Sequence, residues 1–171
     1  MAKISDFSVV DLFCGIGGLT HGFIKEGFTV SAGVDFDNTC CYAYETNNDA
    51  KFVHKDITKL TTEELSGLFP NDKRRILVGC APCQPFSIFN YKNNNNVQKQ
   101  AEDEKWKLLY SFADLIEATQ PEIVSMENVP QLRNFNGGKV LTDFVEKIKK
   151  NNYKVSYDVY NAQDYGVPQR R

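Results

Sequence analysis

The sequence predicts an α/β protein built on a doubly wound, mostly parallel sheet. Two observations lead to this fold class: short apolar runs end at glycine or acidic residues, and amphipathic stretches separate one run from the next. The two kinds of segment alternate along the whole chain, which is typical of parallel strands joined by helical crossovers. The 171 residues suffice for one domain with a single core.

The first part of the chain predicts three pairs of a strand and a helix. Its first apolar run stops at a glycine cluster, the second at Asp35 and the third near Asp56. Thr61 and Thr62 followed by two glutamates are typical of a capped helix start, because carboxylates favour the first turn. In chain order we expect strand 7–13, helix 17–26, strand 28–34, helix 38–47, strand 51–53 and a short helix beginning at Thr61.

The second part predicts three more strands and two longer helices. It also contains a stretch with four consecutive asparagines and no apolar period, which predicts a long loop. Pro121 stands between the first of these helices and the strand that follows it. In chain order we expect strand 76–79, loop 88–103, helix 106–119, strand 122–126, helix 140–149 and strand 153–160.

Composition and charge exclude several classes of protein. The net charge of −2 gives no general basic footprint for nucleic acid, so a nucleic-acid enzyme of this charge would need a local basic face or basic surface from another segment. No apolar stretch approaches the roughly 20 residues that span a bilayer, and the first residues lack a secretory pattern. Five cysteines, an odd number, favour reduced thiols in a cytoplasmic protein over a disulfide framework.

A glycine cluster follows the first predicted strand. Gly15, Gly17 and Gly18 let the backbone turn tightly and approach a ligand, with helix N–H groups pointing toward an anion. Gly22 does not fall where a dinucleotide fingerprint needs its third glycine. Taken alone, the cluster predicts a ligand loop and a tight turn without a ligand equally well.

Acidic residues at the next two strand ends favour the ligand loop. Asp35 is placed to accept hydrogen bonds from a ribose diol, Phe36 could lie flat on an adenine, and Asp56 could accept from an exocyclic amine. The alternative for each carboxylate is a solvated loop residue or a helix cap, for which Asp37 is a candidate. Three consecutive strand ends that offer glycines and then acids predict a nucleoside pocket.

Reactive residues follow the last two predicted parallel strands. Cys83 comes after the fourth strand and Glu127 after the fifth, and the ends of adjacent parallel strands meet at one edge of a sheet. Residues 80–83 also form a C-x-x-C pattern, which alternatively suggests half a zinc site or a redox pair. Other metal ligands are scattered, so we expect no metal, and we expect Cys80 to be a buried strand-end residue.

Four motifs together resemble the C5-cytosine methyltransferases. They are DLFCGIGG at 11–18, PCQPFS at 82–87, MENV at 126–129 and NAQDYGVPQRR at 161–171. The resemblance covers essentially the whole chain and implies the Rossmann-like fold of class I S-adenosylmethionine-dependent methyltransferases. It implies S-adenosyl-L-methionine as the cofactor, held by Phe13, Gly15, Gly17, Gly18, Asp35, Phe36, Asp56, Ile57 and Pro82.

The resemblance also implies the catalytic roles. Cys83 would be the nucleophile, Glu127 would contact cytosine N3 and the exocyclic amine, and Asn128 would orient the loop. Arg171 matches the first arginine of the family's Gln-x-Arg-x-Arg segment. The substrate would be double-stranded DNA with a flipped cytosine, because C6 is inaccessible in a stacked duplex. A mobile loop would close on the DNA, and its expected residues are Ser87, Asn93, Lys99 and Lys105; a merely disordered insertion is the alternative.

The family pattern extends further than this chain. We therefore expect residues 1–171 to form an incomplete catalytic and cofactor-binding domain, without the target-recognition region and truncated before the last antiparallel strand. A split enzyme with a complementing polypeptide, an excerpt of a longer chain and a degenerate fragment all fit this pattern. The expected activity is DNA cytosine-5 methylation in a bacterial restriction–modification system, in the cytoplasm at the nucleoid. The alternatives are the tRNA-modifying branch of the family, a non-catalytic or regulatory module and, distantly, a nicotinamide dehydrogenase.

Overall fold

One sheet of five parallel strands organises the part of the chain that the structure describes. The computed structural model describes residues 2–83 and 104–169. The strand order is β3-β2-β1-β4-β5, and every pairing is parallel. The fold class predicted from the sequence is therefore confirmed. The strands are β1 (Phe7–Leu12), β2 (Thr29–Asp35), β3 (Lys51–His54), β4 (Arg74–Gly79) and β5 (Ile123–Met126).

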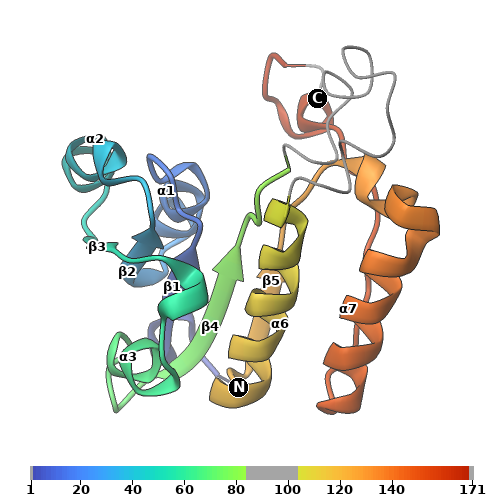
Figure 1. Cartoon of the computed structure of the whole chain (residues 1–171). Coiled ribbons are helices and arrows are strands. Elements are labelled where there is room, and N and C mark those ends of the chain that lie inside the picture. Colours follow the sequence, from blue (N-terminus) through green and yellow to red (C-terminus); the bar gives the residue numbers. More distant parts are fainter. Residues whose placement is uncertain (1, 84–103, 170–171) are drawn as a thin grey trace.

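Helices cover both faces of the sheet. In Figure 1, α3 and α6 lie in front of the strands and α1 lies behind them, while α7 packs beside α6. Helix α2 lies at the β3 edge. The α-helices are α1 (Gly18–Lys25), α2 (Cys41–Asn47), α3 (Thr62–Gly67), α6 (Leu108–Thr119) and α7 (Lys139–Lys150). Short 3-10 helices are η1 (Ile4–Asp6), η2 (Asn38–Cys40), η3 (Ile57–Lys59), η5 (Glu104–Lys107), η6 (Pro130–Arg133), η7 (Phe135–Gly138) and η8 (Ala162–Tyr165).

Alternate residues of β1 pack into two different cores. Val9 lies in a cluster with Phe23 of α1, whereas Val10 lies in the main core with Phe112 of α6. Successive side chains of a strand point to opposite faces, so a strand covered on both sides reads as one apolar run. This explains why the first predicted strand lacks the polar alternation of a half-exposed strand.

The sheet has one topological switch point, between β1 and β4. The chain passes from β1 outward to β3 and then returns to β4 on the other side of β1. Ligands of open α/β sheets bind in the crevice at the carboxyl ends of the two strands that flank such a point. Leu12 pairs with Gly79 there, and a Cβ on Gly79 would lie 3.0 Å from the Leu12 carbonyl oxygen. Glycine at the end of β4 therefore lets the two strand ends approach closely.

Local sequence signals set several element boundaries as expected. Thr61 Oγ1 accepts a hydrogen bond from the Glu64 N–H, and the Glu64 carboxylate accepts one from the Thr61 N–H. This capping box starts α3 and confirms the predicted helix start. A different helix, α6, ends before Gln120, which adopts a left-handed conformation with φ 46° directly before Pro121.

The predicted strand at residues 153–160 is wrong. This segment pairs with no strand in the described part of the chain, and its residues are mostly exposed. Tyr153 is instead anchored by its hydroxyl, which donates to the Pro121 carbonyl. An alternating sequence becomes a strand only where a partner supplies the ladder hydrogen bonds, and no such partner lies beside this segment among the described residues.

Of the four residues predicted for the mobile loop, the structure describes only Lys105. The structure places Lys105 in η5, the short helix that leads into α6, rather than in the loop. Ser87, Asn93 and Lys99 lie outside the described residues, as does Arg171.

Within the described ranges, no helix is long and apolar enough to cross a bilayer.

Candidate active site

The turn after β1 holds three residues in left-handed backbone conformations. Phe13 has φ 59°, Gly15 has φ 51° and Gly17 has φ 90°. A residue with a side chain pays on the order of 1 kcal/mol for this conformation, so its presence at Phe13 marks a constrained segment. A Cβ on Gly17 would lie 2.3 Å from Asn48 Nδ2, which makes glycine obligatory there. The glycine turn, residues 13–18, is thus tight and packed on its inner side.

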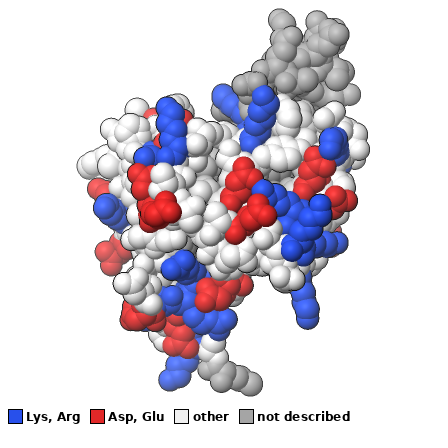
Figure 2. All heavy atoms as spheres, turned by 60° about the horizontal axis from the view of Figure 1, so that its bottom comes forward, with Lys and Arg blue, Asp and Glu red and all other residues white. Residues whose placement is uncertain are grey.

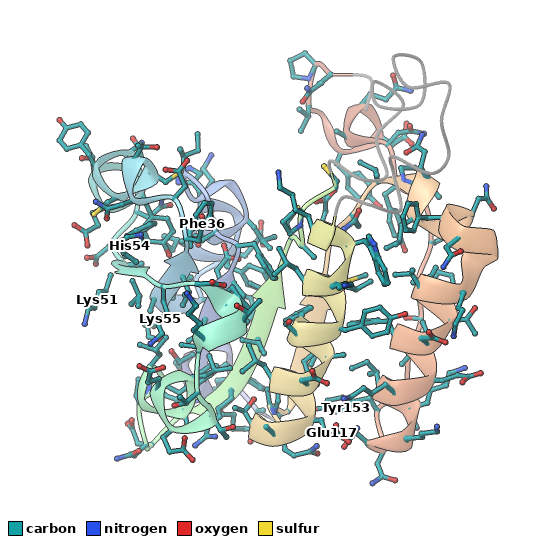
Figure 3. All side chains as sticks on the ribbon, in the orientation of Figure 1. Phe36, Lys51, His54, Lys55, Glu117 and Tyr153 are labelled. Carbon is teal, nitrogen blue, oxygen red and sulfur yellow. The ribbon has the colours of Figure 1, made fainter. Side chains whose placement is uncertain are left out.

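Asp35 joins the glycine turn to the end of β2. Its Oδ2 accepts a hydrogen bond from the Gly15 N–H at 2.9 Å, and its Oδ1 accepts from the Asp37 N–H at 2.9 Å. Each oxygen keeps a second lone pair for a ligand. Phe36 follows at the carboxyl end of β2 (Figure 3), and 72% of its surface is exposed. The end of β2 therefore offers an acceptor and, at the next residue, an exposed aromatic ring.

The side chains of Asp56 and Ile57 mainly stabilise the local fold. Asp56 Oδ1 accepts from the N–H of Thr58 at 3.0 Å and from its hydroxyl at 2.8 Å, which caps η3 and lowers the pKa of Asp56. The side chain of Ile57 is buried in the main core. The helix-cap alternative therefore describes Asp56, and a ligand contact from Ile57 would have to come from its backbone. Asp37 caps η2 in the same way, as predicted.

A buried polar cluster below the glycine turn went unpredicted. Thr20 of α1 donates to Asp11 Oδ2 at 2.7 Å, and the hydroxyls of Thr20 and Tyr44 lie 3.1 Å apart. The other carboxylate oxygen, Asp11 Oδ1, is buried without a hydrogen-bond partner among the described residues. Burial raises the pKa of Asp11 to about 7. The polar residue inside an otherwise apolar run was the signal in the sequence.

On the other side of the switch point, backbone hydrogen bonds join three strand ends. The Cys80 N–H donates to the Leu12 carbonyl at 3.4 Å, and the Glu127 N–H donates to the Gly79 carbonyl at 3.1 Å. The segment from Cys80 to Cys83, called here the thiol turn, therefore starts directly beside Glu127. This confirms that β4 and β5 are adjacent and parallel and end together.

Side chains of residues 127 and 128 both bind the thiol turn. Asn128 Nδ2 donates to the Ala81 carbonyl at 2.9 Å, and Cys80 Sγ donates to Glu127 Oε2 at 2.8 Å. Cys83 is half-buried and packs against the main core. Pro82, between these residues, is half-buried as well. The carboxylate thus contacts Cys80 directly. Cys80 was expected to be a buried strand-end residue; it does follow β4, but it is half-buried.

Charged side chains on the face opposite the switch point are mixed in sign. The view in Figure 2, toward the end of the sheet opposite the switch point, shows basic and acidic side chains interspersed. Several are paired, for example Lys147 with both Asp114 and Glu117. No group of three or more metal-ligating side chains converges within the described part of the chain.

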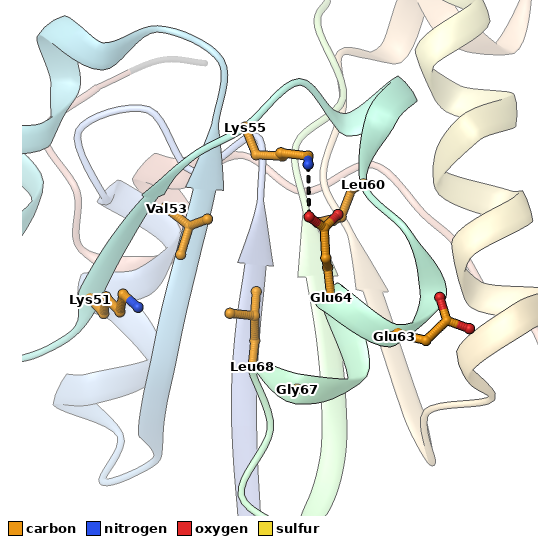
Figure 4. Close-up of a pocket in the computed structure, with 8 residues that line it drawn as sticks. All are labelled: Lys51, Val53, Lys55, Leu60, Glu63, Glu64, Gly67 and Leu68. Atoms are coloured by element: carbon orange, nitrogen blue, oxygen red, sulfur yellow. Dashed lines mark hydrogen bonds and ion pairs between the residues drawn. The ribbon is translucent and has the colours of Figure 1, made fainter.

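A groove of about 280 Å³ lies apart from the switch point, between β3 and α3 (Figure 4). The ion pair between Lys55 and Glu64, 2.8 Å long, closes one side of it. The groove contains neither the glycine turn nor the thiol turn. Its lining residues are Lys51, Val53, Lys55, Leu60, Glu63, Glu64, Gly67 and Leu68.

A doubly wound sheet with a glycine turn, an acidic strand end and a thiol turn at its switch point is the arrangement of a methyltransferase that uses S-adenosylmethionine. The chain belongs to the C-5 cytosine-specific DNA methylase family, whose model matches residues 7–171. The described residues fit this cofactor: a Cβ added to Gly15 or Gly18 would meet no atom within 4 Å, the Asp35 carboxylate lies 2.9 Å from the Gly15 nitrogen, and the Phe36 ring that follows Asp35 is exposed.

Curated relatives are named type II methylases or methyltransferases. The chain is 48% identical over 164 residues to M.HgiDII of Herpetosiphon aurantiacus, covering 96% of this chain and 44% of the relative. It is 31% identical to M.AquIA of a Picosynechococcus strain, covering 95% of this chain and 68% of the relative. It thus spans less than half of M.HgiDII and about two thirds of M.AquIA.

Solved structures share the fold. A DNA modification methyltransferase encoded within an E. coli prophage superposes with a TM-score of 0.73 at 26% identity, covering 96% of this chain and 44% of that one. The methyltransferase EhMeth of Entamoeba histolytica gives a TM-score of 0.76 at 21% identity, covering 98% of this chain and 51% of that one.

Proposed function

We propose that the chain is the cofactor-binding and catalytic part of a cytosine-5 DNA methyltransferase of a bacterial type II restriction–modification system. The main support for this proposal is that the glycine turn and the thiol turn, each held by side-chain hydrogen bonds, flank one switch point of the sheet. On one side, the Asp35 carboxylate holds the glycine turn. On the other, Glu127 and Asn128 hold the thiol turn that contains Cys83. The family and the names of the relatives support the same activity.

Residues of the glycine turn and the β2 end would hold the cofactor. Asp35 would accept from the ribose hydroxyls, Phe36 would stack on the adenine, and the backbone of residues 13–18 would enclose the methionine moiety. Asp56 would offer its remaining acceptor capacity to the adenine amine. When bound, S-adenosylmethionine supplies an electrophilic sulfonium methyl group.

Residues of the thiol side would activate the base. The Cys83 thiolate adds to cytosine C6, forming a carbon–sulfur bond and moving electron density to C5, while Glu127 contacts N3 and the exocyclic amine. After C5 has accepted the methyl group, a base removes the C5 proton and the carbon–sulfur bond breaks, which releases the thiolate. Asn128 keeps the thiol turn in place through the Ala81 carbonyl.

The whole enzyme needs more than this chain supplies. A flipped cytosine in double-stranded DNA is the proposed substrate, and a complementing polypeptide or C-terminal region would carry target recognition and most of the phosphate-binding surface. Ser87, Asn93 and Lys99 would belong to a closing loop, and Arg171 to the positive surroundings of the thiol. Such an enzyme acts on the chromosome, in the cytoplasm at the bacterial nucleoid.

A complementation assay tests the proposal. The chain is produced together with the part of M.HgiDII that lies outside the matched region, and is incubated with DNA or tRNA and methyl-tritiated S-adenosylmethionine. We expect label at C5 of cytosine in DNA, none with Cys83→Ser, and unchanged labelling with Cys41→Ser as a matched thiol control. DNA containing 5-fluorocytosine should form a covalent adduct at Cys83. Labelling of tRNA alone, or labelling that survives Cys83→Ser, would contradict the proposal.

A further inference from the structure

The Cys80 thiol bridges two strand ends. The residue follows β4, and its N–H donates to the carbonyl of Leu12 at the end of β1. Its Sγ donates to Oε2 of Glu127, at the end of β5, at 2.8 Å. Cys80 thus connects both strands that neighbour β4 at the switch point.

The thiol is a stable proton donor. Burial and the neighbouring Glu127 carboxylate both raise the pKa of Cys80 above its ordinary value, so Cys80 keeps its proton at neutral pH. A protonated thiol can donate to a carboxylate, whereas a thiolate would repel it. The two cysteines of the thiol turn therefore have separate roles. Cys80 donates to the Glu127 carboxylate, and Cys83 remains for the cytosine of the proposed reaction.

The backbone around Glu127 is held independently of Cys80. Its own N–H donates to the Gly79 carbonyl, and the next side chain, Asn128, donates to the Ala81 carbonyl. The Glu127 side chain itself is exposed, and a glutamate side chain free to rotate loses on the order of 1.5–2 kcal/mol of rotamer entropy when it is ordered. Among the contacts of the described residues, the Cys80 hydrogen bond is the one that orders the carboxylate.

We propose that Cys80 is a positioning residue: its thiol holds Oε2 of Glu127 and thereby turns the other carboxylate oxygen toward the cytosine. This inference rests on the proposed function, in which Glu127 contacts the base. Preorganisation of an acid before the substrate arrives lowers the barrier of the chemical step more than it strengthens binding. Removal of the donor should accordingly affect kcat more than the affinity for DNA.

The test compares donors of different kinds in the complemented enzyme, with excess reductant so that no disulfide contributes. Cys80→Ala removes the donor and should lower the single-turnover methylation rate about 10- to 100-fold, with DNA affinity changed less than about threefold. Cys80→Ser keeps a donor and should retain activity within about fivefold of wild type. In the double variant of Cys80→Ala with Glu127→Gln, the loss should be close to that of Glu127→Gln alone, because both changes disrupt one unit.

A second measurement uses the chain alone and does not depend on methylation. The pH dependence of Cys80 alkylation, followed by mass spectrometry, should shift to lower pH in Glu127→Gln, because the carboxylate that opposes the thiolate is gone. The inference would be overturned by an unshifted alkylation profile or by full methylation activity of Cys80→Ala. It would also be overturned if Cys80→Ala and Cys80→Ser lost equal activity, or if the losses of the two single variants multiplied in the double variant. Activity that survives Cys83→Ser would instead overturn the proposed function, so the two failures are distinguishable.

Discussion

The carboxylate of Asp35 accepts a hydrogen bond from the N–H of Gly15, 20 residues earlier in the chain, at 2.9 Å. This contact ties the end of β2 to the glycine turn after β1. One residue thus holds the shape of the turn and, in the proposed function, would accept from a ribose. Changes at the half-buried Asp35 should therefore have a larger effect on cofactor binding than changes at exposed acids.

Asp35→Ala should weaken binding of S-adenosylmethionine about 10- to 100-fold, because it removes a charged acceptor and releases the turn. Isothermal titration calorimetry on the complemented enzyme measures the effect. Asp37→Ala is the matched control, since the Asp37 side chain only caps η2. Equal losses for the two variants would argue against the ribose contact.

Phe36→Ala should reduce cofactor affinity about tenfold, because stacking on an aromatic ring contributes roughly 1–3 kcal/mol per base. Tyr42, on α2, is 81% exposed, against 72% for Phe36. Tyr42→Ala is therefore a fair control and should leave affinity unchanged. The same titration decides, and an unaltered affinity in Phe36→Ala would exclude the stacking role.

Asp11 should make stability depend on pH. Burial raises its pKa in the folded protein from the ordinary 3.8 to about 7, so the folded state binds the proton more tightly than the unfolded state. The contribution of Asp11 is present in full below pH 4 and is lost as pH rises through 7. This contribution to the free energy of unfolding is about 4 kcal/mol at most.

Asp11→Asn should flatten this dependence while keeping an acceptor for Thr20. Urea unfolding of both proteins at several pH values between 4 and 8 measures the pH dependence of the free energy of unfolding. The difference in unfolding free energy between variant and wild type should move in favour of the variant as pH rises. A difference that stays constant over this range would show that Asp11 does not titrate there.

Gly17→Ala should destabilise the fold by roughly 2–4 kcal/mol, because the added methyl meets Asn48 and the backbone is left-handed at φ 90°. Gly22→Ala is the matched control: it lies in α1, and its added Cβ would meet nothing within 4 Å. That variant should be stabilised by about 0.5–1 kcal/mol. Thermal unfolding of both variants tests the pair, and similar melting temperatures would contradict the prediction.

Local patterns accounted for most of the strands and for the placement of the candidate site. Strands buried on both faces read directly as apolar runs, and the parallel order followed from their alternation with helices. The ends of β4 and β5 meet as expected, because adjacency follows from chain order. Segment 153–160 failed because a strand depends on a neighbour that its own residues do not specify.

The order of residues along the chain was enough to predict which groups gather at one sheet edge: a glycine turn, Asp35, a thiol turn and Glu127. Which side chains touch became apparent only from the packed fold. Cys80 rather than Cys83 holds the Glu127 carboxylate, and Asp11 is buried against Thr20. The physical reason is that periodicity and turn signals are set by neighbouring residues along the chain. Side-chain hydrogen bonds between separate elements, in contrast, depend on distances that exist only after the strands and helices have packed.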